Sequence, residues 1–72
     1  MYDLGARFKA VRKEKTFTQK QVADGIGVNE RQYQYYEYGK NIPSALVLCA
    51  LADYFDVSLD CLVGRSNDPQ RH

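Results

Sequence analysis

Several features that mark large classes of proteins are scarce in this 72-residue sequence, and each absence narrows the possible functions. The only histidine is His72, at the end of the chain, which excludes a catalytic triad built on histidine. The longest apolar run, Ala45 to Ala52, is too short to cross a bilayer, so we expect no membrane partner. The Gly25-Ile26-Gly27 segment lacks the preceding strand and the lysine of a phosphate-binding loop.

Cysteine is also rare. Cys49 and Cys61 lie twelve positions apart, with no CxxC pair and no histidine nearby, which argues against a zinc site. We interpret both as small hydrophobic residues in or near the core. Two cysteines without a secretory signal indicate a reducing cytosol and hence a cytoplasmic protein. Together these absences predict that the chain is not an enzyme and uses no metal, cofactor or small-molecule ligand.

A strong net charge is absent as well, since the formal charge is only +1. Its distribution is uneven: residues 1–17 hold five basic and two acidic groups, and residues 18–41 hold three of each. Residues 42–72 hold two basic groups against four acidic ones. This loading of positive charge toward the first half is a weak electrostatic footprint for nucleic acid, although an evenly solvated surface could show it by chance.

What is present suits one small globular domain. With 44% apolar and 26% charged residues, the chain is long enough for a single modest core. Residues 1–64 carry the helical patterns described below and form the predicted domain. Residues 65–72 have no periodicity and are predicted to form a flexible tail.

The most informative stretch is residues 18–39, TQKQVADGIGVNERQYQYYEYG. It contains two capping boxes, in which a helix-capping side chain and a glutamine three residues later exchange hydrogen bonds with the backbone. Thr18 and Gln21 form the first box, and Asn29 and Gln32 repeat the spacing. Each box predicts the start of a short helix.

Two glycines predict where these helices end. Gly27 suits a left-handed backbone conformation that residues with a Cβ atom resist, and Gly39 offers the same cap to the second helix. Two capped helices of about eight residues, joined by a turn of about four, form a helix-turn-helix unit.

Specific residues of this stretch carry a resemblance to a known family. The pattern T-Q-x-x-V-A-x-x-x-G-V-N at residues 18–29, followed by Y-x-x-Y-E-x-G at residues 33–39, resembles the phage repressor/Cro (XRE-type, Cro/C1-type) family of helix-turn-helix regulators. The downstream ADYFDVSLDCLVG, residues 52–64, is similar to the last two helices of that family. The resemblance covers roughly residues 4–64. It implies an all-α, five-helix lambda-repressor-like DNA-binding domain.

Apolar periodicity and capping signals predict where the five helices lie. The expected ranges are residues 2–14, 19–25, 30–38, 45–55 and 59–63. In the second helix, we expect the small side chain of Ala23 to allow a close crossing of the two motif helices. Gly25 departs from the family pattern of a helix-forming residue, and we expect it to weaken the helix end by up to about 1 kcal/mol.

The resemblance also implies an internal ion pair. Arg12 follows the core residue Val11, and in this family a first-helix arginine commonly pairs with the glutamate of the Y-E-x-G segment, here Glu37. A carboxylate that faces the core needs a partner, and a guanidinium supplies a bidentate one. We interpret the pair as structural. We interpret Lys9, Lys13 and Lys15 as an ordinary solvent-exposed surface of the first helix, without a specific function.

The third helix divides by face, with Tyr33, Tyr36 and Glu37 on one side. The other side has no packing role, and as a recognition helix it would read bases. Arginine can bond guanine, glutamine can pair with adenine, and glutamate can accept from cytosine while repelling phosphates. An ordinary polar helix face is the alternative. The predicted base-reading residues are Glu30, Arg31, Gln34 and Tyr35.

Phosphate contacts are implied mainly by matching family positions. A helix start favours an anion because its backbone amides are free. The predicted phosphate-contacting residues are Gln19, Gln32, Tyr38, Lys40 and Asn41.

The fourth helix is apolar almost all round, which normally means burial on both faces. Leu48, Leu51, Ala52 and Phe55 match the inward positions of the family. Where relatives commonly carry polar residues, this chain has an apolar stripe that we predict to be a dimer interface; the alternative is that it packs under the fifth helix or the tail. The stripe comprises Leu46, Val47, Ala50 and Tyr54.

The sequence therefore predicts a sequence-specific binder of double-stranded DNA. By resemblance it would be a bacterial or phage transcriptional regulator that acts as a repressor and binds a palindromic operator as a homodimer, with the third helix in the major groove. The alternative is an antitoxin-type or protein-interaction module with weak or no DNA binding. Near-neutral charge and Glu30 at the reading face favour that alternative.

Overall fold

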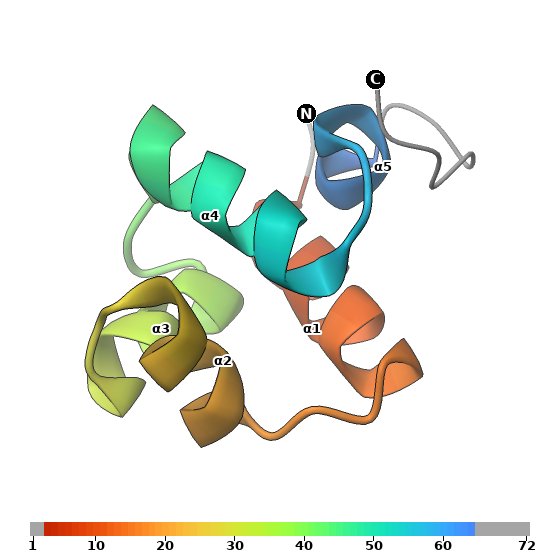
Figure 1. Cartoon of the computed structure of the whole chain (residues 1–72). Helices are drawn as coiled ribbons and strands as arrows, with labels where there is room; N and C mark the ends of the chain where they lie inside the picture. Colours follow the sequence, from red (N-terminus) through yellow and green to blue (C-terminus); the bar gives the residue numbers. More distant parts are fainter. Residues whose placement is uncertain (1–2, 65–72) are drawn as a thin grey trace.

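The computed structural model describes residues 3–64, and these residues form five α-helices without a strand (Figure 1). The helices are α1 (Leu4–Glu14), α2 (Gln19–Ile26), α3 (Glu30–Tyr38), α4 (Ala45–Phe55) and α5 (Leu59–Val63). The predicted all-α, five-helix fold is confirmed. The predicted tail, residues 65–72, lies outside the described residues.

The helix bounds follow the sequence signals closely. The ranges of α3, α4 and α5 agree with the predicted ones, and α2 continues one residue further, to Ile26. The first helix begins at Leu4 rather than at residue 2, because the side chain of Asp3 accepts a hydrogen bond from the Ala6 amide and caps it there.

The two predicted capping boxes differ in the structure. At α2 the box is complete: the Gln21 amide donates to Thr18 Oγ1 (3.0 Å), and the Thr18 amide donates to Gln21 Oε1 (2.8 Å). At α3 only half forms, since the Gln32 amide donates to Asn29 Oδ1 (2.7 Å). The Gln32 side chain instead donates to the Tyr36 hydroxyl (3.1 Å), so the second box was wrongly predicted to be reciprocal.

The turn between α2 and α3 has the expected left-handed residue. Gly27 has φ 81°, and its neighbour Val28 donates its amide back to the Ala23 carbonyl (3.0 Å). These features define a Schellman ending, which fixes the angle at which α3 leaves α2. Thr16 and Asp56 adopt positive φ after α1 and α4 without being glycine, at 63° and 57°.

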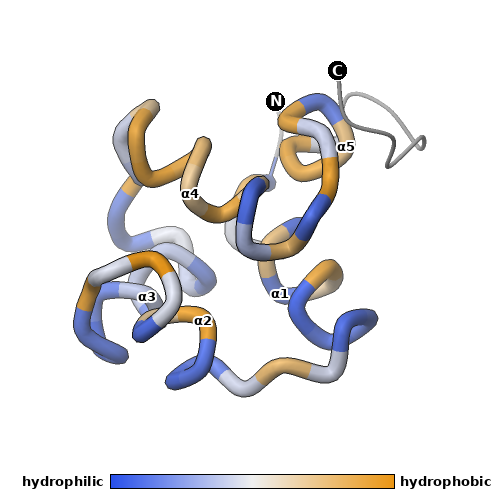
Figure 2. The backbone as a smooth tube through the Cα atoms, in the orientation of Figure 1, coloured by the Kyte–Doolittle hydropathy of each residue, from blue (hydrophilic) through white to orange (hydrophobic). Residues whose placement is uncertain are grey.

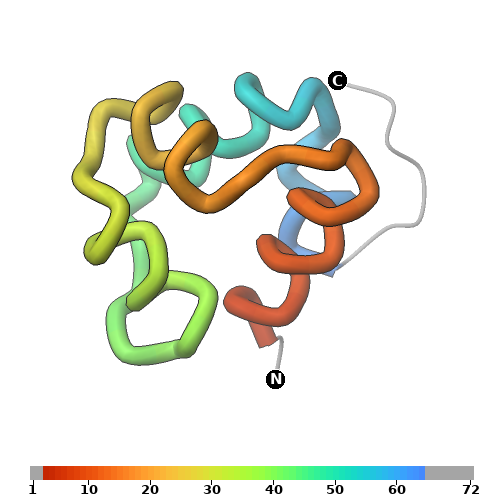
Figure 3. The backbone as a smooth tube through the Cα atoms, turned by 90° about the horizontal axis from the view of Figure 1, so that it is seen from below, coloured from red at the N-terminus to blue at the C-terminus, as the bar shows by residue number. Residues whose placement is uncertain are grey.

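The core lies where all five helices meet. Its fully buried large side chains are Phe8, Val22, Tyr33, Leu51, Phe55 and Leu62. The first helix packs mainly on α3 and α5, and α2 packs on α3 and α4. Seen from below, α1 and α5 lie side by side although they are far apart in the sequence (Figure 3).

Gly25 has a packing role that the sequence did not reveal. A Cβ atom at this position would overlap the ring of Tyr54 on α4. That ring is held between Phe17, at 4.9 Å between centroids, and Phe55, at 6.0 Å. The expectation that Gly25 only weakens α2 is therefore incomplete, because the missing side chain makes room for the α2–α4 contact. Ala23, expected at a close crossing, is fully buried.

Among residues 3–64, no helix is both long enough and apolar enough to span a membrane. Hydrophobic residues nevertheless dominate α4, which is mostly orange, whereas α3 is blue to pale along its length and α2 combines blue and orange (Figure 2).

Candidate nucleic-acid interface

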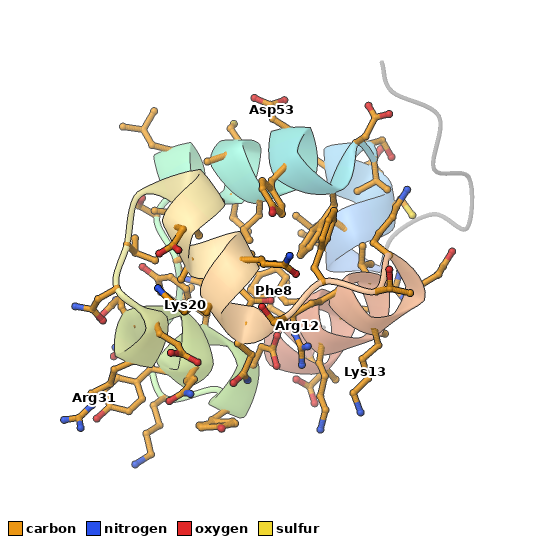
Figure 4. All side chains as sticks on the ribbon, turned by 60° about the horizontal axis from the view of Figure 1, so that its bottom comes forward. Phe8, Arg12, Lys13, Lys20, Arg31 and Asp53 are labelled. Carbon is orange, nitrogen blue, oxygen red and sulfur yellow. The ribbon has the colours of Figure 1, made fainter. Side chains whose placement is uncertain are left out.

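The third helix presents two chemically different faces. Tyr33, Tyr36 and Glu37 are buried, as predicted for the inner face. Glu30 and Arg31 are exposed, and Gln34 and Tyr35 are partly exposed. Arg31 points away from the body of the protein, on the side opposite Asp53 of α4 (Figure 4). The four predicted base-reading residues are thus brought together on one accessible face.

The predicted Arg12–Glu37 pair is present and anchors α3 to α1. Arg12 Nε lies 2.6 Å from Glu37 Oε2, and Arg12 Nη2 donates to Glu37 Oε1 at 3.2 Å. A third guanidinium bond, from Nη1 to the Phe17 carbonyl (3.0 Å), ties the loop after α1 to the same site. The Glu37 side chain is only 1% exposed, so this bidentate pair is largely sealed from solvent.

The electrostatics of this pair keep Glu37 ionised. Burial opposes ionisation, but the hydrogen bonds from Arg12 and Gln19 outweigh it and hold the pKa of Glu37 below its usual range. Burial also raises the pKa of the neighbouring Tyr33 phenol, and the Glu37 carboxylate raises it further. The Tyr33 hydroxyl is buried beside the carboxylate without forming a well-aligned hydrogen bond to it.

Gln19, the first residue of α2, connects this buried pair to the outer face of α3. Its Nε2 donates to Glu37 Oε1 at 3.1 Å, and its Oε1 accepts from Gln34 Nε2 at 3.2 Å. A predicted phosphate-contacting residue and a predicted base-reading residue are therefore in direct contact. The sequence pattern gave no signal for this bond, because it depends on how the two helices cross.

A groove runs between α1 and α3, beside the first turn of α2. Its lining residues are Lys9, Arg12, Lys13, Phe17, Thr18, Gln19, Glu30, Glu37 and Tyr38. Lys13 points outward from α1 on the same side of the molecule as Arg31 (Figure 4). Lys9 and Lys13 were interpreted as an ordinary solvated face, yet the fold places them on the groove that Gln19 and Tyr38 share.

Three more of the predicted phosphate-contacting residues lie around the end of α3, and Gln32 lies in its first turn. Tyr38, Lys40 and Asn41 are exposed, and the amides of Lys40 and Asn41 donate to the Tyr35 carbonyl at 2.9 and 3.4 Å. Lys40 Nζ lies 5.4 Å from the centroid of the Tyr35 ring. The loop is thus fixed to α3, and its ammonium group lies beside a base-reading candidate.

The α4 stripe is only partly open. Leu46 is 84% exposed, whereas Val47 and Tyr54 pack against the chain's own core and Ala50 is partly buried. Cys49 is exposed on the same helix and does not lie in or near the core as predicted, while Cys61 is buried as expected. The open surface of α4 is therefore narrower than the sequence indicated, and it centres on Leu46.

Within the described part of the chain, no group of three or more histidine, cysteine, aspartate or glutamate side chains is arranged to hold a metal ion. The candidate site consists of polar and basic side chains around α3 and the first turn of α2.

Comparison with known families agrees with this geometry. A helix-turn-helix family model matches residues 8–60, which is most of the chain. The chain therefore belongs to the helix-turn-helix family, of the repressor/Cro (XRE) type, as its motif predicts. The family consists of DNA-binding transcriptional regulators rather than enzymes.

Characterised and uncharacterised regulators are among its relatives. The transcriptional regulator AnsR of Bacillus subtilis is 38% identical over 64 residues, which are 89% of this chain and 55% of that protein. The uncharacterised regulator YqaE of the same organism is 39% identical, over 83% of this chain and 53% of that protein. The CTXphi phage repressor RstR of Vibrio cholerae is 42% identical, over 67% and 43%. The chain spans about half the length of these curated relatives.

Two solved structures resemble the fold closely. The P22 c2 repressor, crystallised with a synthetic operator, has a TM-score of 0.79 and 25% identity, over 88% of this chain and 96% of that one. A transcriptional regulator from Listeria innocua has a TM-score of 0.81 and 31% identity, over 89% and 60%.

Proposed function

We propose that this chain binds double-stranded DNA sequence-specifically and regulates transcription, with α3 in the major groove. The observation that carries the proposal is the division of α3: one face is anchored in the core through Glu37, and the other is accessible and chemically varied. The P22 c2 repressor, which shares the fold, binds an operator, and the relatives named above are transcriptional regulators.

Each residue of the outer face has a distinct task. Arg31 is exposed and suits a bidentate contact to guanine O6 and N7. Gln34 suits adenine, Glu30 can accept from cytosine N4, and Tyr35 supplies a ring and a hydroxyl next to Lys40. A helix that reads bases through such side chains needs a fixed angle to the groove, which the Arg12–Glu37 pair and the Gly27 turn supply.

The phosphate contacts lie on two sides of the reading face. Lys40, Asn41 and Tyr38 extend from the end of α3, while Gln19 and Gln32 stand at or near the starts of α2 and α3. To these we add Lys9 and Lys13, which line the groove beside Gln19. Their positive charge supplies the attraction to phosphates that a net charge of +1 does not reveal.

A second copy of the chain completes the proposed site. One short recognition helix offers limited contact with DNA, and two copies related by a two-fold axis would read a palindromic operator with half-sites about one helical turn apart. The open part of the α4 stripe, Leu46 with Ala50, is the candidate interface. Because this surface is small, we expect the dimer to assemble mainly on DNA. We propose a repressor in the cytoplasm of a bacterium, encoded by the bacterium or by a phage.

The second candidate function is a protein-interaction module. Glu30 lies exposed at the first turn of α3, where it would repel phosphates, and it favours this alternative. Selection of bound duplexes from a random pool, followed by titrations at several salt concentrations, tests the proposal. We expect the bound duplexes to share a sequence motif, and the logarithm of the affinity to fall linearly with the logarithm of the salt concentration. A chain that enriches no motif and binds DNA independently of salt would be a protein-interaction module instead.

A further inference from the structure

We infer that Gln19 is a positioning residue that sets the hydrogen-bonding direction of Gln34, and so determines base preference without itself touching a base. This inference rests on the proposed DNA-reading function of α3. It comes from a continuous chain of hydrogen bonds that runs from Arg12 through Glu37 and Gln19 to Gln34, which we call the relay.

The direction of the chain is set at its buried end. The Glu37 side chain is sealed between helices and paired with a guanidinium, so it is a carboxylate and can only accept hydrogen bonds. An amide next to a carboxylate must present its NH₂ group, and Gln19 does so through Nε2 at 3.1 Å. The opposite orientation would place Gln19 Oε1 against a negative charge.

This constraint passes to the outer face through the second bond. Because Gln19 Nε2 donates to Glu37, Gln19 Oε1 faces Gln34. It accepts a hydrogen bond from Gln34 Nε2 at 3.2 Å. Gln34 is left with its carbonyl oxygen and one N–H for the groove. That is the pair of groups that recognises adenine through N6 and N7, so the fold pre-orients this amide before DNA arrives.

A purely phosphate-contacting Gln19 makes a different prediction. Phosphate contacts carry no sequence information, so losing one weakens binding to every sequence alike. A positioning Gln19 changes the relative affinity for the four base pairs at one site position. A measurement of base preference therefore distinguishes the positioning role from the phosphate-contacting role, whereas a measurement of affinity alone does not.

The experiment uses the whole chain and an operator obtained from the random-pool selection. The position read by Gln34 is located first, as the one where Gln34→Ala loses preference. Gln19→Lys then keeps a donor for Glu37 and a cation for phosphates but removes the acceptor for Gln34, and Gln19→Met removes both hydrogen bonds at similar size. Each is titrated against duplexes carrying all four base pairs at that position.

Both variants should reduce the wild-type preference at this position by about fivefold or more, the discrimination expected of one good base contact. Gln19→Lys should do so while retaining affinity for DNA in general. Gln32→Met is the matched control, because Gln32 bonds to the Tyr36 hydroxyl and lies outside the relay; it should lower affinity equally for all four duplexes.

A second readout needs no DNA. In the free protein, the side-chain NH₂ signals of Gln34 in a ¹⁵N–¹H spectrum should shift in Gln19→Lys and remain in place in Gln32→Met. If Gln19→Lys keeps the wild-type preference while affinity changes uniformly, the inference is overturned and Gln19 is a phosphate contact only. If wild-type protein enriches no motif, the proposed function fails as a whole, and the free-protein spectra still show whether the relay exists.

Discussion

The third and fourth helices differ in how clearly their sequences state their roles. In α3 the residues expected to pack and those expected to be accessible divide by face, and burial follows the pattern: Tyr33, Tyr36 and Glu37 lie inside, and Arg31 lies outside. The α4 sequence is apolar on nearly every side, yet only part of it is buried, and Leu46 is 84% exposed. A mixed pattern thus predicts which face is buried and which is accessible, whereas a uniform one leaves packing and partner binding indistinguishable.

The largest expected effect tests the inner face of α3. Glu37→Gln removes the carboxylate and strands the Arg12 guanidinium, whose side chain is 11% exposed, and we expect a loss of about 3–5 kcal/mol in the free energy of unfolding. The total free energy of unfolding of native proteins is only about 5–15 kcal/mol, so this substitution would remove a large part of the stability. Chemical denaturation measures this. A variant within a few tenths of a kcal/mol of wild type would show that the pair contributes little.

The pH dependence of stability sharpens the same point. Because the pKa of Glu37 is lower in the folded chain than in the unfolded one, its stabilising contribution is present above the unfolded value, about 4.3. It is lost as the pH falls through the folded pKa. Wild-type protein should therefore lose more stability than Glu37→Gln on acidification below about pH 4. Parallel curves for the two proteins would contradict this assignment.

The next effect tests the packed side of α4. Gly25→Ala places a methyl group against the Tyr54 ring, and we expect a net loss of about 1–2 kcal/mol in the free energy of unfolding, since overpacking outweighs the better helix propensity of alanine. In a Tyr54→Leu background the same change should be neutral or stabilising. Thermal unfolding of all four proteins measures the coupling. Additive effects would mean that the ring moves aside freely.

A third experiment tests the outer face of α3 against the loop that follows it. Arg31→Ala should cost about 1–3 kcal/mol on the selected operator and relax preference at one base pair. Lys40→Ala should weaken all duplexes alike and make the salt dependence shallower, because one phosphate contact is lost. Binding titrations on operator and random DNA separate the two. If Arg31→Ala lowered the affinity for operator and random DNA equally, Arg31 would not be a base-reading residue.

The smallest effect on folding is expected on the open side of α4. Leu46→Glu combined with Ala50→Lys changes an exposed and a partly exposed position, so stability should stay within about 0.5 kcal/mol of wild type. Binding to a single half-site should persist, while cooperative binding to paired half-sites should disappear. Gel-shift titrations on both kinds of duplex measure this. Unchanged cooperativity would place the interface elsewhere.

Much of the fold could be predicted because its signals are local. Capping residues such as Thr18 and Asn29 and the left-handed glycines Gly27 and Gly39 act within one turn of a helix, so helix positions follow from the sequence alone. The Arg12–Glu37 pair also followed, but only from family resemblance.

What could not be predicted depends on how distant segments meet. The contact of Gly25 with Tyr54 and the relay from Gln19 to Gln34 arise from helix crossings that no periodicity encodes. The placement of Lys9 and Lys13 on the groove has the same origin. The second capping box failed because Tyr36 offered Gln32 a competing partner one turn away.

The packing of α1 against α3 and α5 affects the order in which the domain assembles. Its Phe8 and Val11 are covered by helices that follow much later in the chain, and Arg7 donates to the carbonyl of Cys61 at 2.7 Å across 54 positions. During synthesis α1 therefore emerges before both helices that cover it, and its apolar side is not fully covered until α5 has left the ribosome. The helix-turn-helix forms from neighbouring segments, but the ion pair that orients it requires α1. Competence to read DNA should therefore arrive only after the 25 positions between Arg12 and Glu37 have closed into a loop.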